Sequence, residues 1–371
     1  MYFIGFLCLG SVGYIMGGSL PNVQCMENEQ EALLKFKEGL VNHWDRLFSW
    51  MVEEEADCCK WRGVKCNRTT GHVMALDLHS QSPNESLQGE LNYSALLDLP
   101  YLTYLAWNLN DFKQSQIPQF TGSLPNLKYL NLSNANFRGN IPSDLGNLSR
   151  LHSLDLSSSS YHSLGANNLD WLRGLSSLKI LDLGGVDHSK AVNWLNEINM
   201  LPSLVELHLF DCNLNKLPSS LPRVNFTSPE IIDLSLNSFN SPIPWPQFPE
   251  WLCTQKDLLY IDISDASISD IVPDWFWNIS TKVEHMILVS SQLRGKVPDL
   301  SPLANFSHLD LGENNFDGPL PRFSANMKSL RLYGNSFSGP ISSICEWMVA
   351  NSSLVDVQLF SNKLSGLLPD C

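Results

Sequence analysis

Basic residues are scarce in this sequence, in which 24 Lys and Arg stand against 38 Asp and Glu and give a formal net charge of −14. Proteins that bind nucleic acids normally present a basic face, so this balance argues against a nucleic-acid partner. After the first residues, no apolar run approaches the roughly 18 residues that a membrane span requires. Kinase signatures are also missing, since the chain has no Gly-rich phosphate loop, no His-Arg-Asp and no Asp-Phe-Gly.

The nine cysteines, by contrast, are more than a protein of the reducing cytosol needs. Cys25, Cys58, Cys59 and Cys66 bracket one short segment, which predicts a disulfide staple and an oxidising compartment. A zinc site is the alternative, but it would need Cys-x-x-Cys or Cys/His spacing, which is absent here. We therefore expect neither a metal nor a cofactor.

The first residues, MYFIGFLCLGSVGYIMGG, form a short apolar stretch followed by small residues. They predict a secretory signal peptide over residues 1–24, removed between Gly18 and Gln24. Asn-x-Ser/Thr acceptor sites recur along the rest of the chain and fit a glycosylated, secreted surface. These sites are Asn67, Asn84, Asn92, Asn131, Asn147, Asn225, Asn278, Asn305 and Asn351.

One phrase, Leu-x-x-Leu-x-Leu followed by a polar run and Phe-x-Gly-x-Ile-Pro, occupies Leu127–Pro142 and returns from Phe306 and Met327. Repetition at about 20–29 residues is the signature of a leucine-rich repeat solenoid. The alternation around the fourth to sixth positions predicts one short parallel strand per repeat, lining a concave face. Twelve repeats begin at Val73, Leu102, Leu127, Leu151, Leu178, Leu204, Pro229, Leu258, Val283, Phe306, Met327 and Leu354.

Two further positions of the repeat predict how its turns stack. The ninth is an inward Asn at Asn110, Asn237, Asn314, Asn335 and Asn362, where the amide can bond the backbone of neighbouring turns. Elsewhere between residues 127 and 291 this asparagine is replaced, so we expect a patchy ladder of such side chains and looser turns there; the replacing residues are Ala135, Ser159, Val186, Cys212, Ala266 and Ser291. Two residues later, a buried aromatic column is predicted, and Gly-x-Ile/Val/Leu-Pro phrases then predict tight turns on the convex side. The column comprises Phe137, Phe239, Phe316 and Phe337, and the phrases begin at Gly139, Gly295 and Gly318.

The segment 25–70 is predicted to cap the first repeat, and residues 71–371 to hold the repeats. Asn28, with Glu31 three residues later, predicts the start of a helix. An apolar stripe follows at helical spacing, with Glu and Lys residues outside, and two tryptophans complete the plug. The stripe and the tryptophans are Ala32, Leu33, Phe36, Leu40, Trp50 and Trp61.

Recognition, not catalysis, is the function that the concave positions favour. Histidines at His152, His208, His285 and His308 lie on separate repeats without the spacing of a metal site. A regular Asp column at the fifth position is the solvated face of Leu-Asp-Leu strands, so we expect no enzyme. Exposed aromatics on a rigid sheet are typical anchors for peptides or proteins, although isolated ones also occur as incidental surface. The candidate ligand-binding residues are Tyr104, Tyr129, Glu206, His208, Phe210, Tyr260, His285, Tyr333 and Phe360.

The cap closely resembles that of plant extracellular leucine-rich repeat proteins. The resemblance rests on CMENEQEALLKFKEGL, on Asp57-Cys58-Cys59-x-Trp61-x-Gly63-Val64-x-Cys66 and on Thr70-Gly71-His72-Val73, together with the Gly-x-Ile-Pro phrase. It is most similar to the receptor-like proteins of plant immunity, in the group that contains fungal-xylanase receptors. The resemblance implies a right-handed α/β horseshoe with a parallel sheet on the concave side, short 3₁₀ or loop segments on the convex side, and a helical, disulfide-bonded cap.

The same resemblance implies disulfides Cys25–Cys58 and Cys59–Cys66. Cys345 and Cys371 lie one repeat apart at matching loop positions, and we expect a third bridge there. Cys212, at a ladder position, is expected to be a buried free thiol, and Cys253 has no counterpart that we recognise.

By resemblance, the chain is expected to be the ectodomain of a plant receptor-like protein that senses an extracellular protein, peptide or glycan elicitor and signals through a separate co-receptor kinase. Such receptors continue with further repeats and a transmembrane helix, whereas this sequence stops mid-repeat without a C-terminal cap. We therefore expect the secretory pathway and either the extracellular side of the plasma membrane or the apoplast. The alternatives are a secreted polygalacturonase-inhibitor-like protein and a truncated, non-signalling fragment.

Overall fold

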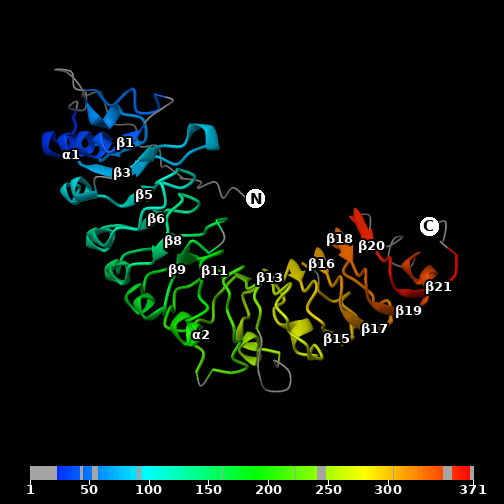
Figure 1. Ribbon diagram of the computed structural model, residues 1–371. Helices are drawn as coiled ribbons and strands as arrows, with labels where there is room; N and C mark the ends of the chain where they lie inside the picture. The colour runs from blue at the N-terminus through cyan, green and yellow to red at the C-terminus, as the bar shows by residue number, and fades with distance from the viewer. Residues whose placement is uncertain are drawn as a thin grey trace, which may run out of the picture.

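The computed structural model is an arc whose inner side is one long sheet (Figure 1). It describes residues 23–41, 45–51, 57–89, 93–160, 162–221, 223–239, 248–303, 305–345 and 353–367. Nearly all of the predicted signal peptide, the acceptor sites Asn92 and Asn351, and Cys371 lie outside the described residues.

Each of the twelve predicted repeats contributes one strand to the concave sheet, and an antiparallel strand of the cap makes it thirteen. Except for β3, which begins at the first position, the strands occupy the third to fifth repeat positions, one earlier than predicted. The sixth-position N–H still bonds the neighbouring strand, as from Leu156 N to Asp182 O over 2.9 Å. In order, they are β2 (Val64–Cys66), β3 (Val73–Asp77), β5 (Tyr104–Ala106), β6 (Tyr129–Asn131), β8 (Ser153–Asp155), β10 (Ile180–Asp182), β11 (Glu206–His208), β12 (Ile231–Asp233), β13 (Tyr260–Asp262), β14 (His285–Ile287), β16 (His308–Asp310), β18 (Ser329–Arg331) and β20 (Asp356–Gln358).

The core fills the arc behind this sheet. Leu151, Leu154 and Leu156, the first, fourth and sixth residues of one repeat, are fully buried, as the pattern predicts. The predicted phenylalanine column is buried as well, with the rings of Phe316 and Phe337 stacked at 6.4 Å.

The ninth-position asparagines bond the backbone of adjacent repeats. Asn314 Nδ2 donates to Leu288 O over 2.6 Å, and its Oδ1 accepts from the main-chain N–H groups of Ser291 and Leu293. In the patchy region, Cys212 Sγ lies 3.2 Å from Leu183 O, and Ser291 Oγ donates to Ile263 O over 2.9 Å. Two of the side chains that replace asparagine therefore still contact the backbone of the preceding repeat. That the turns in this region are looser stays a prediction.

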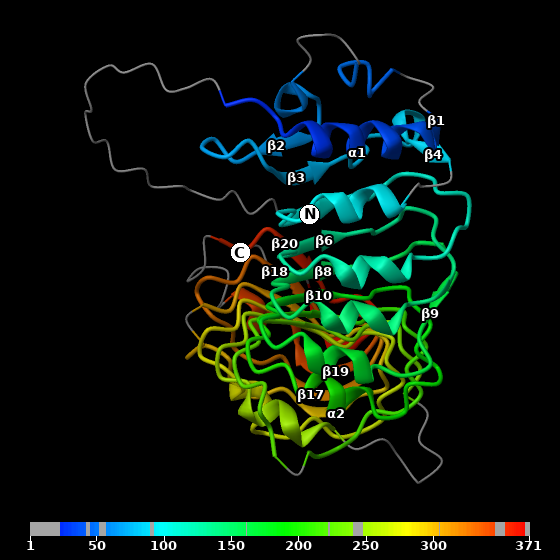
Figure 2. The same cartoon turned by 90° about the vertical axis from the view of Figure 1, so that its left-hand side faces the viewer.

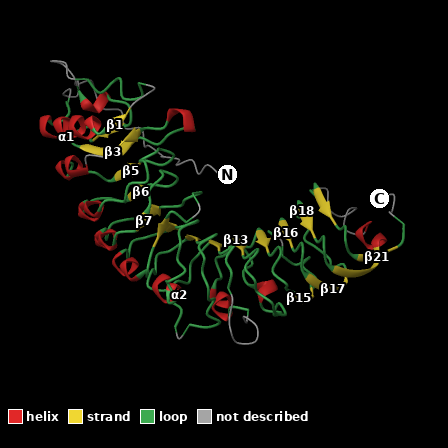
Figure 3. Ribbon diagram, viewed as in Figure 1, coloured by secondary structure: helices red, strands yellow, loops and turns green. Residues whose placement is uncertain are grey.

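The convex side carries mostly short helices, shown in red in Figure 3. The phrases that begin at Gly139, Gly295 and Gly318 were predicted to be tight turns, but these glycines lie in parallel strands. The left-handed glycine (φ +90° at Gly318) fits within an extended segment that bonds the next repeat. These strands are β7 (Gly139–Asn140) with β9 (Leu164–Gly165), and β15 (Arg294–Lys296), β17 (Asn315–Pro319), β19 (Ser336–Pro340) and β21 (Lys363–Ser365). The helices are α2 (Trp194–Ile198), η2 (Pro83–Glu85), η3 (Tyr93–Asp98), η4 (Gln119–Ser123), η5 (Ser143–Asn147), η6 (Asp170–Gly174), η7 (Glu250–Thr254), η8 (Phe276–Asn278) and η9 (Ile341–Ser343).

The cap closes the first repeat with helix α1 (Glu27–Glu38), which lies across the end of the solenoid next to β2 and β3 (Figure 2). Its short elements are η1 (Cys58–Lys60) and β1 (Leu40–Val41), which pairs with β4 (Gln88–Gly89). The predicted aromatic plug is present, with Trp50 and Trp61 buried and stacked at 5.3 Å.

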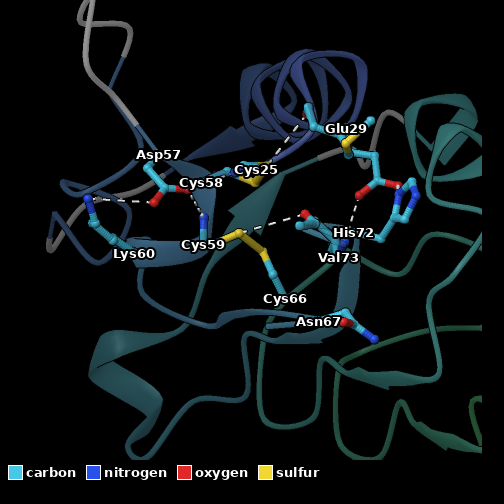
Figure 4. Close-up of a disulfide and its surroundings, with 12 residues drawn as sticks. Cys25, Glu29, Asp57, Cys58, Cys59, Lys60, Cys66, Asn67, His72 and Val73 are labelled. Atoms are coloured by element: carbon cyan, nitrogen blue, oxygen red, sulfur yellow. Dashed lines mark hydrogen bonds and ion pairs between the residues drawn. A yellow bond between two sulfur atoms is a disulfide. The ribbon is translucent and has the colours of Figure 1, made fainter. Parts of the chain in front are cut away.

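The predicted helix start at Asn28 is wrong. Helix α1 begins at Glu27, and its N-cap residue Met26 makes no side-chain capping bond. Glu29, expected on the outside, is fully buried, and its carboxylate accepts from Val73 N over 2.6 Å and lies 2.8 Å from His72 Nδ1 (Figure 4). The first turn is therefore fixed by a contact with the first repeat rather than by a local capping box.

Candidate functional site

The candidate site is the solvent-facing side of the concave sheet. Side chains at the third and fifth repeat positions point outward, and the parallel register brings them side by side across neighbouring strands. All nine predicted binding residues lie on this face, either on strands β5, β6, β11, β13 and β14 or just after strands β11, β18 and β20.

At the N-terminal end, Tyr104 and Tyr129 form an aromatic pair whose rings lie face to face. Their rings stack at 4.3 Å with an interplanar angle of 3°. Burial raises the pKa of Tyr104, and the neighbouring Tyr129 raises it further, so the phenol stays neutral. Asn131 Nδ2 donates to Tyr129 OH over 3.3 Å and to Asp155 Oδ2 over 2.9 Å, which fixes the second tyrosine.

In the middle of the sheet, His208 lies among carboxylates. Its Nε2 is 3.8 Å from Glu206 Oε2, and the register places it between Asp182 and Asp233. Burial alone would lower the pKa of His208, but the carboxylates of Glu206, Asp182 and Asp233 outweigh burial and raise the pKa. The middle of the concave face therefore presents a protonatable imidazole next to carboxylate groups.

Further along, Tyr260, His285 and His308 form a row. The rings of Tyr260 and His285 are 5.9 Å apart, and those of His285 and His308 stack at 4.2 Å. Burial lowers the pKa of His285 and of His308, and the charge of Lys328 lowers that of His308 further, so the neutral form of both rings is favoured near pH 7. His308 was not among the predicted binding residues, although its third position in the repeat placed it in this row.

Three aromatics project from the seventh position, just beyond the strands. They are Phe210, Tyr333 and Phe360, and the rings of the last two stack at 5.1 Å. Phe210 and Tyr333 each contact a glycine at the same position of the preceding repeat, Gly184 and Gly312. These glycines were not predicted from the sequence. The signal that could have found them is a glycine and an aromatic residue at the same position of two successive repeats.

The structure brings the predicted residues together in pairs and not in one pocket. From β5 to β20 the sheet extends about 45–50 Å, at roughly 4.8 Å per strand. Arg331, another residue that was not predicted, bridges Asp356 at 2.7 Å and Asp310 at 3.6 Å near the far end. Such an arrangement can contact an extended chain or a protein surface, but not one small molecule with all of its parts at once.

The cysteine cluster in the cap is covalently paired. Cys25 is bonded to Cys58 and Cys59 to Cys66, and Asp57 Oδ1 accepts from Cys25 N and Cys59 N (Figure 4). The four sulfur atoms lie within 4.8 Å of one another, so the same residues could hold a metal only if both bonds were reduced. Cys345 is disulfide-bonded as well, while Cys212 is free and buried and Cys253 is free and exposed.

The acceptor asparagines differ in exposure. Asn131 lies on the concave strand β6, where its amide is hydrogen-bonded to Asp155, and Asn67 is partly buried. The exposed ones, Asn84, Asn147, Asn225, Asn278 and Asn305, lie away from the strands of the concave sheet. In the part of the chain that the structure describes, no helix has the length and apolarity needed to span a membrane.

Family models match two parts of the chain: a leucine rich repeat N-terminal domain at residues 26–67 and a leucine rich repeat at residues 126–148. Receptor-like protein EIX1 of Solanum lycopersicum is 36% identical over 309 residues, which are 78% of this chain and 26% of that protein. Receptor-like protein EIX2 of the same species is 37% identical over 362 residues, 92% of this chain and 34% of that protein. The chain thus spans about a quarter to a third of the length of these relatives.

Among solved structures, the ectodomain of the Arabidopsis receptor kinase HAESA, in complex with an IDA peptide hormone ligand, has a TM-score of 0.61. It is 23% identical in sequence, and the match covers 92% of this chain and 54% of that one. This likeness shows the fold of a leucine-rich repeat ectodomain.

Proposed function

Because this chain is a leucine-rich repeat protein of the plant receptor-like protein group, we propose that it is an extracellular recognition module that binds an extended peptide or protein segment along its concave face. A role in sensing an immune or developmental elicitor, with signalling through a separate co-receptor kinase, belongs to the same proposal. Its place is the secretory pathway and the extracellular side of the membrane.

One observation carries the proposal: the concave sheet presents stacked aromatic pairs and charged groups in register over about 45–50 Å. Aromatic side chains held on rigid strands give large contact area at a low cost in conformational entropy, so they serve as binding anchors. The HAESA ectodomain, which shares this fold, was solved in complex with a peptide hormone ligand, and this supports the choice of a peptide.

The test uses the secreted chain and a displayed library of random peptides of about twelve residues, which span about 40 Å when extended. A variant with Tyr129→Ala, His208→Ala, Phe210→Ala and Tyr260→Ala should lose the peptides that the unmodified protein enriches. The matched control carries four substitutions on the convex sheet, at Arg294, Lys296, Asp317 and Lys363, all exposed.

The control variant should keep the enrichment, and both variants should show cooperative unfolding. Enrichment that survives the concave substitutions, or that disappears equally in both folded variants, would remove the concave face from the proposal.

A further inference from the structure

A second candidate site lies where the cap meets the first repeat. A cavity of 230 Å³ is lined there by Arg46, Arg62 and Lys65, together with Asp77 and His79. Asp77 is the single carboxylate among these residues, and its Oδ1 lies 2.5 Å from His79 Nδ1. Although the chain has a net charge of −14, three basic side chains line this one cavity.

Arg46 forms a fixed wall of this cavity. The residue is 7% exposed, and its guanidinium donates to the main-chain oxygens of Leu78, His79 and Glu85 over 2.7 to 3.2 Å. Burial lowers the pKa of Arg46, and the nearby charge of Arg62 lowers it further, while the carboxylates of Glu85 and Asp77 offset part of this shift. Two guanidinium groups thus repel each other across the cavity, and an anion between them would offset that repulsion.

The other two cations are exposed, but their backbone is held firmly. Arg62 N donates to Ser49 Oγ, and Arg62 O accepts from Trp50 Nε1, both over 2.9 Å. Lys65 belongs to strand β2. Within the described residues, neither Arg62 nor Lys65 forms an ion pair. Both side chains are therefore available to a ligand.

The cavity continues the concave face. Lys65 pairs with Ala75, Ala75 with Tyr104, and Tyr104 with Tyr129, so these four side chains form one row on the same side of the sheet. Lys65 and Tyr104 are two strands apart, which corresponds to about 10 Å. An extended chain covers that distance with about three residues.

We propose that this cavity binds the carboxylate of an acidic residue in an extended peptide ligand, and that an aromatic residue about three positions away in that peptide packs against the stacked pair of Tyr104 and Tyr129. Guanidinium and ammonium groups form strong, charge-assisted hydrogen bonds with carboxylates, and the bidentate geometry of Arg62 suits a planar carboxylate. This inference rests on the proposed function, since it assigns the chemistry of one end of the peptide.

The experiment titrates the full secreted chain with two synthetic peptides by calorimetry. One is acetyl-Glu-Glu-Ser-Ser-Tyr-amide, and the other replaces both Glu residues with Gln. We expect the acidic peptide to bind about tenfold more tightly, the value of one charge-assisted pair. That preference should vanish in Arg62→Gln/Lys65→Gln and persist in the matched control Arg294→Gln/Lys296→Gln, which removes the same two charges from the convex sheet.

Three results would overturn the inference: equal binding of both peptides, a preference that survives Arg62→Gln/Lys65→Gln, or inorganic sulfate binding as tightly as the acidic peptide. The last would identify a site for a small inorganic anion. The probes do not depend on the peptides selected from the library. A missing acidic preference would therefore overturn this inference alone, while loss of library enrichment concerns the proposed function.

Discussion

The ring of Phe210 occupies the space that a side chain at Gly184 would need. A Cβ atom at Gly184 would lie 2.1 Å from Phe210 Cε1 and 2.3 Å from Cζ. Tyr333 covers Gly312 in the same way, with Cζ 2.3 Å from the corresponding position. In both pairs the glycine stands one repeat before the aromatic residue, so the glycine determines where the ring lies on the concave face.

Gly184→Ala should therefore displace Phe210 without unfolding the protein. The ring lies at the surface and can rotate away, so we expect the free energy of unfolding to fall by no more than about 1 kcal/mol. Affinity for a library-selected peptide should fall as far as in Phe210→Ala. Titration calorimetry and urea unfolding check the two expectations. Full affinity in Gly184→Ala combined with lost affinity in Phe210→Ala would show that the ligand does not need the ring in this place.

Asp182→Asn should stabilise the protein at neutral pH. Burial raises the pKa of Asp182 to about 6, and the charge of Asp155 contributes. The folded pKa is thus above its ordinary value of 3.8, so the stability that this group provides below pH 3.8 is lost as the pH rises through 6. An amide avoids that loss and can still accept the hydrogen bond from Gly184 N.

The expected gain is about 1–3 kcal/mol at pH 7, and it should disappear near pH 4. Urea unfolding at both pH values measures it. Asp317→Asn on the convex sheet is the control and should change little, because that residue is exposed. A gain of the same size at both pH values would mean that ionisation of Asp182 is not its cause.

Most of the fold could be predicted from the sequence because each repeat restates the same local rule. Inward leucines at fixed positions determine which residues form strands, and the register then follows from stacking identical turns. The concave location of the candidate residues was readable for the same reason. The peptide-binding role of that face stays a prediction.

What the sequence could not show are contacts between distant or unlike segments. Glu29 resembles an exposed helix residue, and its burial depends on Val73, 44 positions later. The convex strands form only because successive repeats carry similar Gly-containing segments that pair with each other. One such segment on its own has the sequence of a turn. The cavity between Arg46 and Arg62 exists only after the cap has folded onto the first repeat.

His188 should be a site where stability is easily gained. It occupies the position of the phenylalanine column, is 1% exposed, and neither ring nitrogen has a hydrogen-bond partner among the described residues. Burial lowers its pKa to about 4, below the ordinary 6.5. The neutral ring is therefore the folded form, and stability is lost as the pH falls from 6.5 through 4.

His188→Phe, and His188→Leu as the smaller variant that matches Leu214 in the next repeat, should raise the free energy of unfolding by about 1–2 kcal/mol at pH 7. The advantage should grow by about 3 kcal/mol between pH 6.5 and pH 4. Thermal unfolding across this range measures the trend. A pH-independent difference in both variants would show that protonation of His188 does not limit acid stability.

The ladder position should matter more at Asn237 than at Cys212. Asn237 Oδ1 accepts from Cys212 N at 3.1 Å and Leu214 N at 3.0 Å, while its Nδ2 donates to Leu209 O at 2.7 Å. Truncation to Ala leaves these buried groups unpaired, so we expect a cost of about 3–5 kcal/mol.

Cys212 has only a weak donor, with Sγ 3.2 Å from Leu183 O, so Cys212→Ala should cost about 1–2 kcal/mol, mostly through lost packing. Urea unfolding of the two variants compares them directly. Because both residues are fully buried at equivalent positions of successive repeats, cavity formation affects both, and the excess cost at Asn237 measures its hydrogen bonds. If the two variants lose the same free energy of unfolding, the hydrogen bonds of the asparagine add no stability beyond the packing of the side chain. Repeats without the asparagine would then be as stable as repeats that have it.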